Sequence, residues 1–144
     1  MRALLDTNII VRHLTGDPPG QARRATAFLA GDNELVLADL MFAELVYVLE
    51  SYYGRPRNEV AAATRALLAL PSVVSDHELL LRSVELYEAE RLDFADAYVC
   101  AAAEISGIGV VVSFDRCDKV TGITPSAGSA LTLSDGFGGR TVVP

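Results

Sequence analysis

Cysteine is scarce in this chain of 144 residues, and several other marks of common protein classes are missing. Two cysteines, Cys100 and Cys117, are too few for a disulfide framework or a zinc ribbon, which favours a reducing setting. No apolar run approaches the roughly 20 residues that a membrane-spanning helix needs. The first residues, MRALLDTN, lack a signal-peptide layout because Asp6 interrupts the short apolar stretch. We therefore expect a cytoplasmic protein with no membrane partner.

Signature loops of nucleotide binding and acyl hydrolysis are also missing. The sequence has no G-x-x-x-x-G-K-[ST] loop, no G-x-S-x-G elbow and no internal repeat. Basic residues are few, since twelve Lys+Arg stand against nineteen Asp+Glu and the net charge is −7. A general nucleic-acid binder has a basic footprint, so this charge excludes binding through a broad basic surface. The charge does not exclude a metal-dependent enzyme that acts on a nucleic acid.

The hydrophobic residues, 51% of the chain, are arranged as strands that alternate with helices. The sequence predicts strands at 2–5, 34–38, 73–74 and 109–114, and helices at 8–14, 21–30, 40–53, 58–70, 75–91 and 94–105. This alternation predicts an α/β fold, a three-layer α/β/α sandwich with a central, mostly parallel sheet. The length fits one domain, which we place at 1–125, followed by a Gly-rich tail at 126–144.

Polar residues mark several of the expected helix starts. Ser75 and Glu78 have the spacing of a capping box. Asp39 and Asp93 each stand directly before a helical pattern, so we expect both to be N-caps. The residues 16–20, GDPPG, should end the first helix, because Gly and Pro both interrupt helices.

Four of the nineteen acids stand alone in apolar runs or directly after one. They are Asp6, Glu44, Asp96 and Asp115. A helix that is apolar nearly all round is expected to be buried. A carboxylate there costs several kcal/mol unless it is paired or holds a metal. Asp6 and Asp115 also follow predicted strands, at the sheet edge where ligands of such folds bind.

Each of these acids also has an ordinary structural explanation. Asp6 could cap the helix that follows it, and Asp115 could be a turn residue. Asp96 could complete a capping box with Asp93, and Glu44 could pair with a buried arginine. Their joint occurrence, with two of them at strand ends, favours a shared site.

Carboxylates that converge on one site require a cation, because their mutual repulsion is otherwise relieved only by protonation. The candidate ligands are all hard oxygens, which select Mg²⁺ or Mn²⁺ over Zn²⁺. Mg²⁺ keeps several waters and is usually completed by substrate phosphates. The natural reaction is therefore phosphodiester hydrolysis, with one or two ions activating a water.

The motifs resemble those of PIN-domain ribonucleases, in particular the VapC-type toxins of toxin–antitoxin pairs. The similar segments are Asp6-Thr7-Asn8, Glu44 within a helix, Asp93-Phe94-Ala95-Asp96-Ala97, and Ser113-Phe114-Asp115, and together they span roughly residues 1–125. The resemblance implies an α/β/α sandwich and Mg²⁺-dependent endonuclease activity on RNA. It also implies a homodimer and a cognate antitoxin that inserts an arginine into the acidic pocket.

The resemblance also assigns roles to single residues. It makes Asp6, Glu44, Asp96 and Asp115 the catalytic and metal-ligating acids, with Thr7, Asn8, Asp93 and Ser113 as supporting residues. The sequence departs from the pattern at Cys117, where many relatives have a further acid, and Asp118 follows it. Arg12 and Arg116 are the candidates for holding RNA phosphates, since a guanidinium suits phosphate.

Three other functions remain open at the level of sequence. The chain could be a PIN-type nuclease that is not a toxin. It could be a phosphatase that uses Asp6 as a nucleophile, although Asn8 stands where such enzymes carry a second acid. It could also be a non-catalytic module whose acidic pocket receives a partner's basic side chain.

Overall fold

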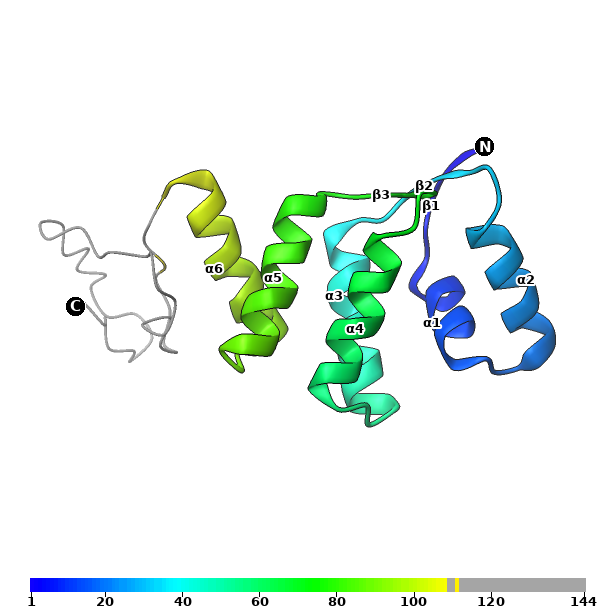
Figure 1. Ribbon diagram of the computed structural model, residues 1–144, viewed down its shortest axis with the longest axis horizontal. Helices are drawn as coiled ribbons and strands as arrows, with labels where there is room; N and C mark the ends of the chain where they lie inside the picture. The colour runs from blue at the N-terminus through cyan, green and yellow to red at the C-terminus, as the bar shows by residue number, and fades with distance from the viewer. Residues whose placement is uncertain (109–110, 112–144) are drawn as a thin grey trace, which may run out of the picture.

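A computed structural model describes residues 1–108 and residue 111, and this part contains a parallel sheet (Figure 1). The strands are β1 (Arg2–Leu4), β2 (Glu34–Val36) and β3 (Val73–Val74), in the order β1-β2-β3. Ala3 pairs with Leu35, and Leu35 pairs on its other side with Val73. The sheet confirms the predicted α/β class with parallel strands.

Helices connect the strands and continue beyond β3. They are α1 (Thr7–Thr15), α2 (Pro19–Leu29), α3 (Asp39–Tyr47), the π-helical turn η1 (Val48–Tyr52), α4 (Arg57–Leu68), α5 (His77–Ala89) and α6 (Phe94–Ser106). Parallel strands require such crossovers, because the chain must return to the same end of the sheet. In Figure 1 the helices follow one another in the order α2, α1, α3 with α4, α5, α6. The predicted helices are therefore all present, with ends displaced by a few residues.

The helix expected at 40–53 is not a regular α-helix throughout. It ends in η1, where the backbone N–H of Tyr53 donates to the carbonyl of Val48, five residues back, at 3.1 Å. A π turn widens the helix, and such turns are frequent at functional sites. The apolar pattern that predicted the helix does not distinguish α from π geometry, so the sequence did not show this change.

Two predicted caps are wrong. Ser75 does not cap α5, because Asp76 is the N-cap and its carboxylate accepts from the backbone N–H of Leu79 at 3.3 Å. Asp39 lies inside the first turn of α3 rather than at its N-cap, which is Ala38. Each predicted cap is one residue from the observed one. Asp39 and Asp76 both lie at a helix N-terminus, where a negative charge is favourable.

The other two helix-boundary predictions hold in position. Asp93 is the N-cap residue of α6, although its side chain forms no capping hydrogen bond. Gly16 ends α1 with φ of 74°, and its N–H donates to the carbonyl of Arg12 at 3.1 Å. That left-handed conformation suits glycine because it has no Cβ. The break between the first two helices is shorter than the predicted segment 16–20, since α2 already begins at Pro19.

An aromatic cluster joins α3, α5 and α6 in the core. The ring of Phe94 lies 5.5 Å from that of Phe42 and 6.2 Å from that of Tyr87, measured between centroids. Cys100 is fully buried in the same core, as its apolar surroundings in the sequence indicate. The cluster fixes the start of α6, which carries Asp96, against α3, which carries Glu44.

Arg57 ties the connection between α5 and α6 to α4. Its Nη1 donates to the carbonyl of Tyr87 at 2.6 Å and also to the carbonyl of Leu92. The guanidinium lies 4.2 Å from the centroid of the Tyr87 ring. The Tyr87 hydroxyl donates to Glu50 of η1, and burial together with this bond raises the pKa of Tyr87 well above its usual value. One side chain thus holds two carbonyls next to the segment that leads to Asp93.

Some predictions fall on the rest of the chain. The strand expected at 109–114, the domain end at 125 and the tail at 126–144 lie outside the described residues. Of the helices that the structure describes, none is both long and apolar enough to cross a membrane.

Candidate active site

Asp6 stands where β1 ends and α1 begins. The backbone N–H of Leu5 still donates to the carbonyl of Val36 in β2 at 2.9 Å, so the chain leaves the sheet at Asp6. The Asp6 carboxylate caps α1, since its Oδ1 accepts from the N–H of Asn8 at 2.7 Å. Capping was the ordinary explanation for Asp6, and it is correct. It uses one oxygen of an exposed carboxylate, which has capacity to accept more partners.

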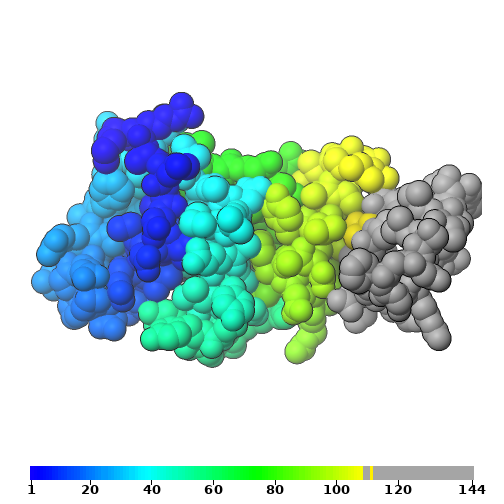
Figure 2. All heavy atoms as spheres, turned by 180° about the vertical axis from the view of Figure 1, so that it is seen from behind, coloured from blue at the N-terminus to red at the C-terminus, as the bar shows by residue number. Residues whose placement is uncertain are grey.

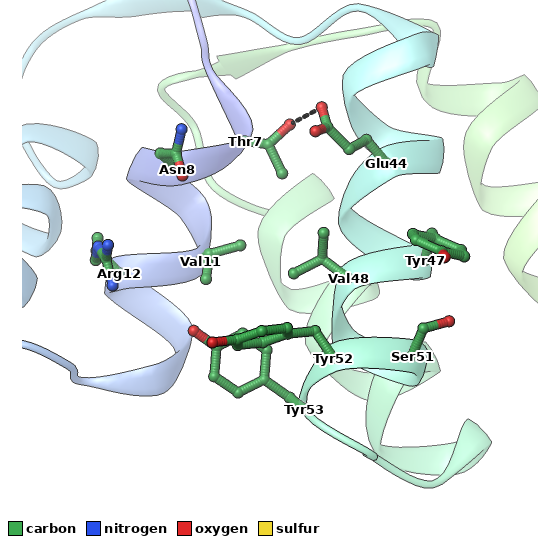
Figure 3. A pocket seen from close by; sticks show the side chains of 10 residues that line it. All are labelled: Thr7, Asn8, Val11, Arg12, Glu44, Tyr47, Val48, Ser51, Tyr52 and Tyr53. Carbon is green, nitrogen blue, oxygen red and sulfur yellow. Dashed lines mark hydrogen bonds between the residues drawn. The ribbon is translucent and has the colours of Figure 1, made fainter.

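Thr7 connects this strand end to α3. Its hydroxyl donates to Oε2 of Glu44 at 2.9 Å, and Thr7 itself is buried (Figure 3). The two residues meet because β1 and β2 are neighbours, so the helices that follow them, α1 and α3, start at the same edge of the sheet. The bond fixes the direction of the Glu44 side chain toward the start of α1.

The acids are not buried, contrary to the sequence expectation. Asp6 and Glu44 are exposed, and Asp96 is partly exposed. Near Glu44, two of the apolar neighbours that suggested burial are themselves on the surface, since Leu40 is 73% and Tyr47 is 67% exposed. The large desolvation cost therefore does not apply at these positions. Asp6 and Glu44 share a place beside the carboxyl ends of β1 and β2 rather than a dry interior.

Asp96 lies in the first turn of α6, and two polar links fix this helix in addition to the aromatic cluster. The Tyr98 hydroxyl donates to Oδ2 of Asp39 at 2.6 Å, and this bond together with burial raises the pKa of Tyr98 to about 12. Arg82 of α5 holds Glu104 of α6 through two N–H donors, at 2.7 and 3.0 Å. The α6 helix that carries Asp96 is therefore attached to the start of α3 and to α5.

The remaining predicted site residues are not described. Ser113, Asp115 and Arg116, together with Cys117 and Asp118, lie outside the residues that the structure covers. Among the residues it does cover, no three of His, Cys, Asp and Glu are grouped closely enough to hold a metal ion. The structure thus brings Glu44 to Thr7, next to Asp6, and places Asp96 on a neighbouring helix.

A groove of about 470 Å³ lies between α1 and the α3–η1 segment (Figure 3). Figure 2 shows the surface of α1, in dark blue, beside that of α3, in cyan, on one face of the molecule. The lining residues come from one face of each helix: Thr7, Asn8, Val11 and Arg12, and opposite them Glu44, Tyr47, Val48, Ser51, Tyr52 and Tyr53. The supporting residues Thr7 and Asn8 and the candidate RNA contact Arg12 are thus in one groove with Glu44.

Arg12 lies on the α1 side of this groove. Its Nη1 donates to the carbonyl of Asp17 at 3.0 Å, which holds the partly exposed guanidinium against the turn after α1. Among the described residues that line the groove, Arg12 is the only Lys or Arg. A guanidinium in this position has donors left for a phosphate.

The tyrosines of the groove were not among the predicted site residues. Tyr47 and Tyr52 follow Glu44 by three and eight positions, which is the spacing of one helix face. This spacing was the available signal. Tyrosines on an apolar helix are usually core residues, whereas Tyr52 is 81% exposed.

The donor set fits a hard divalent cation. The nearby side-chain donors from Asp6, Thr7, Asn8 and Glu44 are oxygens or an amide, with no thiolate or imidazole among them. Mg²⁺ is commonly held by one or two carboxylates, with waters and substrate phosphates completing its shell. Two exposed carboxylates beside a groove open to solvent meet that requirement.

Comparison with known protein families gives one match. Residues 3–117 match the PIN domain family, so the chain belongs to this family, whose members are typically metal-dependent nucleases. The matched range includes Asp6, Glu44, Asp96 and Asp115. No curated protein matches the chain.

Proposed function

We propose that this protein is an endoribonuclease that depends on Mg²⁺ or Mn²⁺ and that it is the toxin of a toxin–antitoxin pair of the VapC type. The catalytic and metal-ligating residues in this proposal are Asp6, Glu44, Asp96 and Asp115. Membership of the PIN domain family supports the nuclease function. The toxin role and the RNA substrate are proposed from the resemblance of the four motifs.

The observation that carries the proposal is the bond between Thr7 and Glu44. It joins a helix acid to the residue that follows Asp6, although the two acids are far apart in the sequence. A glutamate that served only solubility would not need a buried threonine to orient it. The same bond places Glu44 beside a groove with an arginine on its opposite wall.

Each described residue of the proposed site then has a role in the reaction. Asp6 and Glu44 supply oxygen ligands from two fixed elements, and Thr7 holds Glu44 in position. Arg12 binds a substrate phosphate through its free donors, and Asn8 offers an amide at the edge of the groove. A bound divalent ion supplies positive charge that lowers the pKa of a water and offsets the charge of the phosphate. The products are two RNA fragments.

The proposed partners follow from the two carboxylates, Asp6 and Glu44, beside the groove. An antitoxin that inserts an arginine would supply the positive charge that Asp6 and Glu44 attract, and it would block the groove to RNA. The protein is proposed to form a homodimer, as relatives of this type do. A short reading frame for an antitoxin directly upstream of the gene would support the toxin role. Its absence would favour a PIN-type nuclease with another task.

Removal of divalent ions tests the enzymatic part of the proposal. We expect the purified protein to cleave RNA in Mg²⁺ or Mn²⁺, to lose this activity in EDTA, and to regain it when Mg²⁺ is added in excess. The measurement is the appearance of new RNA ends on a denaturing gel. Cleavage that continues unchanged in EDTA would contradict the role of a cation. Hydrolysis of a small phosphomonoester with a trapped aspartyl-phosphate would instead favour a phosphatase.

A further inference from the structure

We propose that the tyrosine-lined end of the groove is a subsite for a base of single-stranded RNA, with Tyr52 as the stacking platform. This inference rests on the proposed function and adds how the substrate is held. It concerns Tyr47, Tyr52 and Tyr53, none of which belongs to the acidic constellation.

The exposure of the tyrosine rings is the first observation. Tyr52 is 81% and Tyr47 is 67% exposed, although both line the groove. Tyr53 is partly buried, and its ring lies 5.0 Å from that of Tyr52 at an interplanar angle of 73°. This edge-to-face contact supports Tyr52 from below without covering it. Figure 3 shows the Tyr52 and Tyr53 rings together at the end of the groove away from Glu44.

The π turn gives these rings their place. Glu44, Tyr47, Val48, Ser51 and Tyr52 lie on one face of the continuous α3–η1 segment, and the turn adds Tyr53 to that face. On the opposite side of the turn, Glu50 accepts the hydroxyl of Tyr87, which anchors η1 to α5. Tyr52 is about 12 Å from Glu44 along the helix axis, from the rise of about 1.5 Å per residue. A base stacked on Tyr52 is therefore separated from Glu44 by only a short stretch of the RNA strand.

The composition of the groove favours RNA over an apolar protein segment. Of the lining residues in the described part of the chain, only Val11 and Val48 are aliphatic, whereas Asn8, Arg12 and Ser51 offer hydrogen bonds. A strand of RNA presents the matching groups, with flat bases for the tyrosines and phosphates for Arg12. A protein with net charge −7 has little general attraction for the RNA backbone. Stacking, which needs no charge and no particular base, can supply that affinity.

The absence of tryptophan from the chain makes the test specific. Tyr52→Trp introduces a single indole at the proposed platform, and Ile105→Trp places one on α6, outside the groove, as the matched control. Both proteins are titrated with a short oligoadenylate in EDTA, so that no cleavage takes place. We expect the fluorescence of Tyr52→Trp to be quenched and that of Ile105→Trp to be unchanged. In parallel, Tyr52→Ala should weaken binding of a labelled oligoadenylate by at least about fivefold.

Several outcomes separate this inference from its alternatives. Equal quenching of both tryptophans, or unchanged binding by Tyr52→Ala, would overturn it. If the fluorescence of Tyr52→Trp falls as the protein concentration rises in the absence of RNA, the inference would also be overturned. The tyrosine-lined end of the groove would then be a contact between copies of the chain. Quenching of Tyr52→Trp alone in a protein that cuts no RNA would support the subsite and contradict the proposed nuclease. Cleavage of RNA without quenching of Tyr52→Trp would support the proposed nuclease and contradict the subsite.

Discussion

Replacing Glu44 by Gln lowers the rate of metal-dependent RNA cleavage by about 100-fold or more, if Glu44 ligates the cation as proposed. The substitution is nearly isosteric, and an amide oxygen can still accept the 2.9 Å hydrogen bond from Thr7. It removes only the negative charge. Because Glu44 is exposed, the free energy of unfolding should change by less than about 0.5 kcal/mol. The measurements are single-turnover cleavage and urea unfolding of the same preparation.

Glu59→Gln is the matched control for that experiment. Glu59 is also an exposed helix glutamate, and its partner is Arg55 one turn away on the surface. It lies outside the groove, so its substitution should leave cleavage unchanged. Asp6→Asn is the companion variant, because asparagine caps a helix about as well as aspartate and the fold is kept. If Glu44→Gln cleaves RNA as fast as the wild type, Glu44 is not a ligand or catalyst.

Replacing Arg57 by Ala lowers the free energy of unfolding by about 3 kcal/mol. The variant leaves the carbonyls of Tyr87 and Leu92 without their donor, at about 1–3 kcal/mol for each that water does not reach. It also loses the cation–π contact with the Tyr87 ring, worth about 0.5–1 kcal/mol. Arg57→Lys should recover only part of this loss, because its ammonium can donate to the carbonyls but lacks the planar guanidinium that packs on the Tyr87 ring.

Arg55→Ala is the control for the stability experiment. Its side chain is 52% exposed and pairs with Glu59 on the surface, a contact worth about 0.5 kcal/mol or less. Chemical denaturation followed by circular dichroism measures both variants. A loss for Arg57→Ala no larger than that for Arg55→Ala would mean that the Arg57 bonds do not stabilise the link between α5 and α6.

The class of fold could be predicted because it depends on periodicity and on strong helix stops. Short apolar runs in the sequence indicate the strands at Arg2–Leu4 and Val73–Val74. A glycine indicates the end of the first helix, at Gly16. The predicted caps of α3 and α5 are each one residue from the observed ones. In α5 the neighbouring carboxylate of Asp76 takes the role expected of Ser75, and in α3 the helix begins at Asp39 itself, after the apolar N-cap Ala38. The π turn η1 could not be predicted, since the bond from Tyr53 to Val48 leaves no mark in the hydrophobic pattern.

The candidate site was partly visible in the sequence, although for a reason that the structure corrects. Isolation among apolar residues drew attention to Asp6 and Glu44, but they are exposed. Their shared place follows from the order of β1 and β2 in the sheet, which the sequence does not specify residue by residue. The bond from Thr7 to Glu44 links segments distant in the chain, and no local pattern encodes such a contact.

Part of the net charge of −7 comes from residues of the candidate site. The same excess that argues against broad backbone binding includes Asp6 and Glu44. These two acids lie beside a groove in which Arg12 is the single basic residue among the described lining residues. RNA that enters this groove meets its positive charge in Arg12 and in the proposed cation. This arrangement predicts an enzyme that contacts RNA over a small area.

Mn²⁺ binding tests most directly whether acids from separate segments hold a divalent cation, as proposed. Electron paramagnetic resonance measures free Mn²⁺ as the ion is added to the wild type, to Glu44→Gln and to Asp96→Asn. We predict that the wild type removes Mn²⁺ from solution and that each variant requires at least about tenfold more Mn²⁺ for the same occupancy. Wild-type protein that leaves the signal unchanged, or variants that bind Mn²⁺ as tightly as the wild type, would contradict the claim.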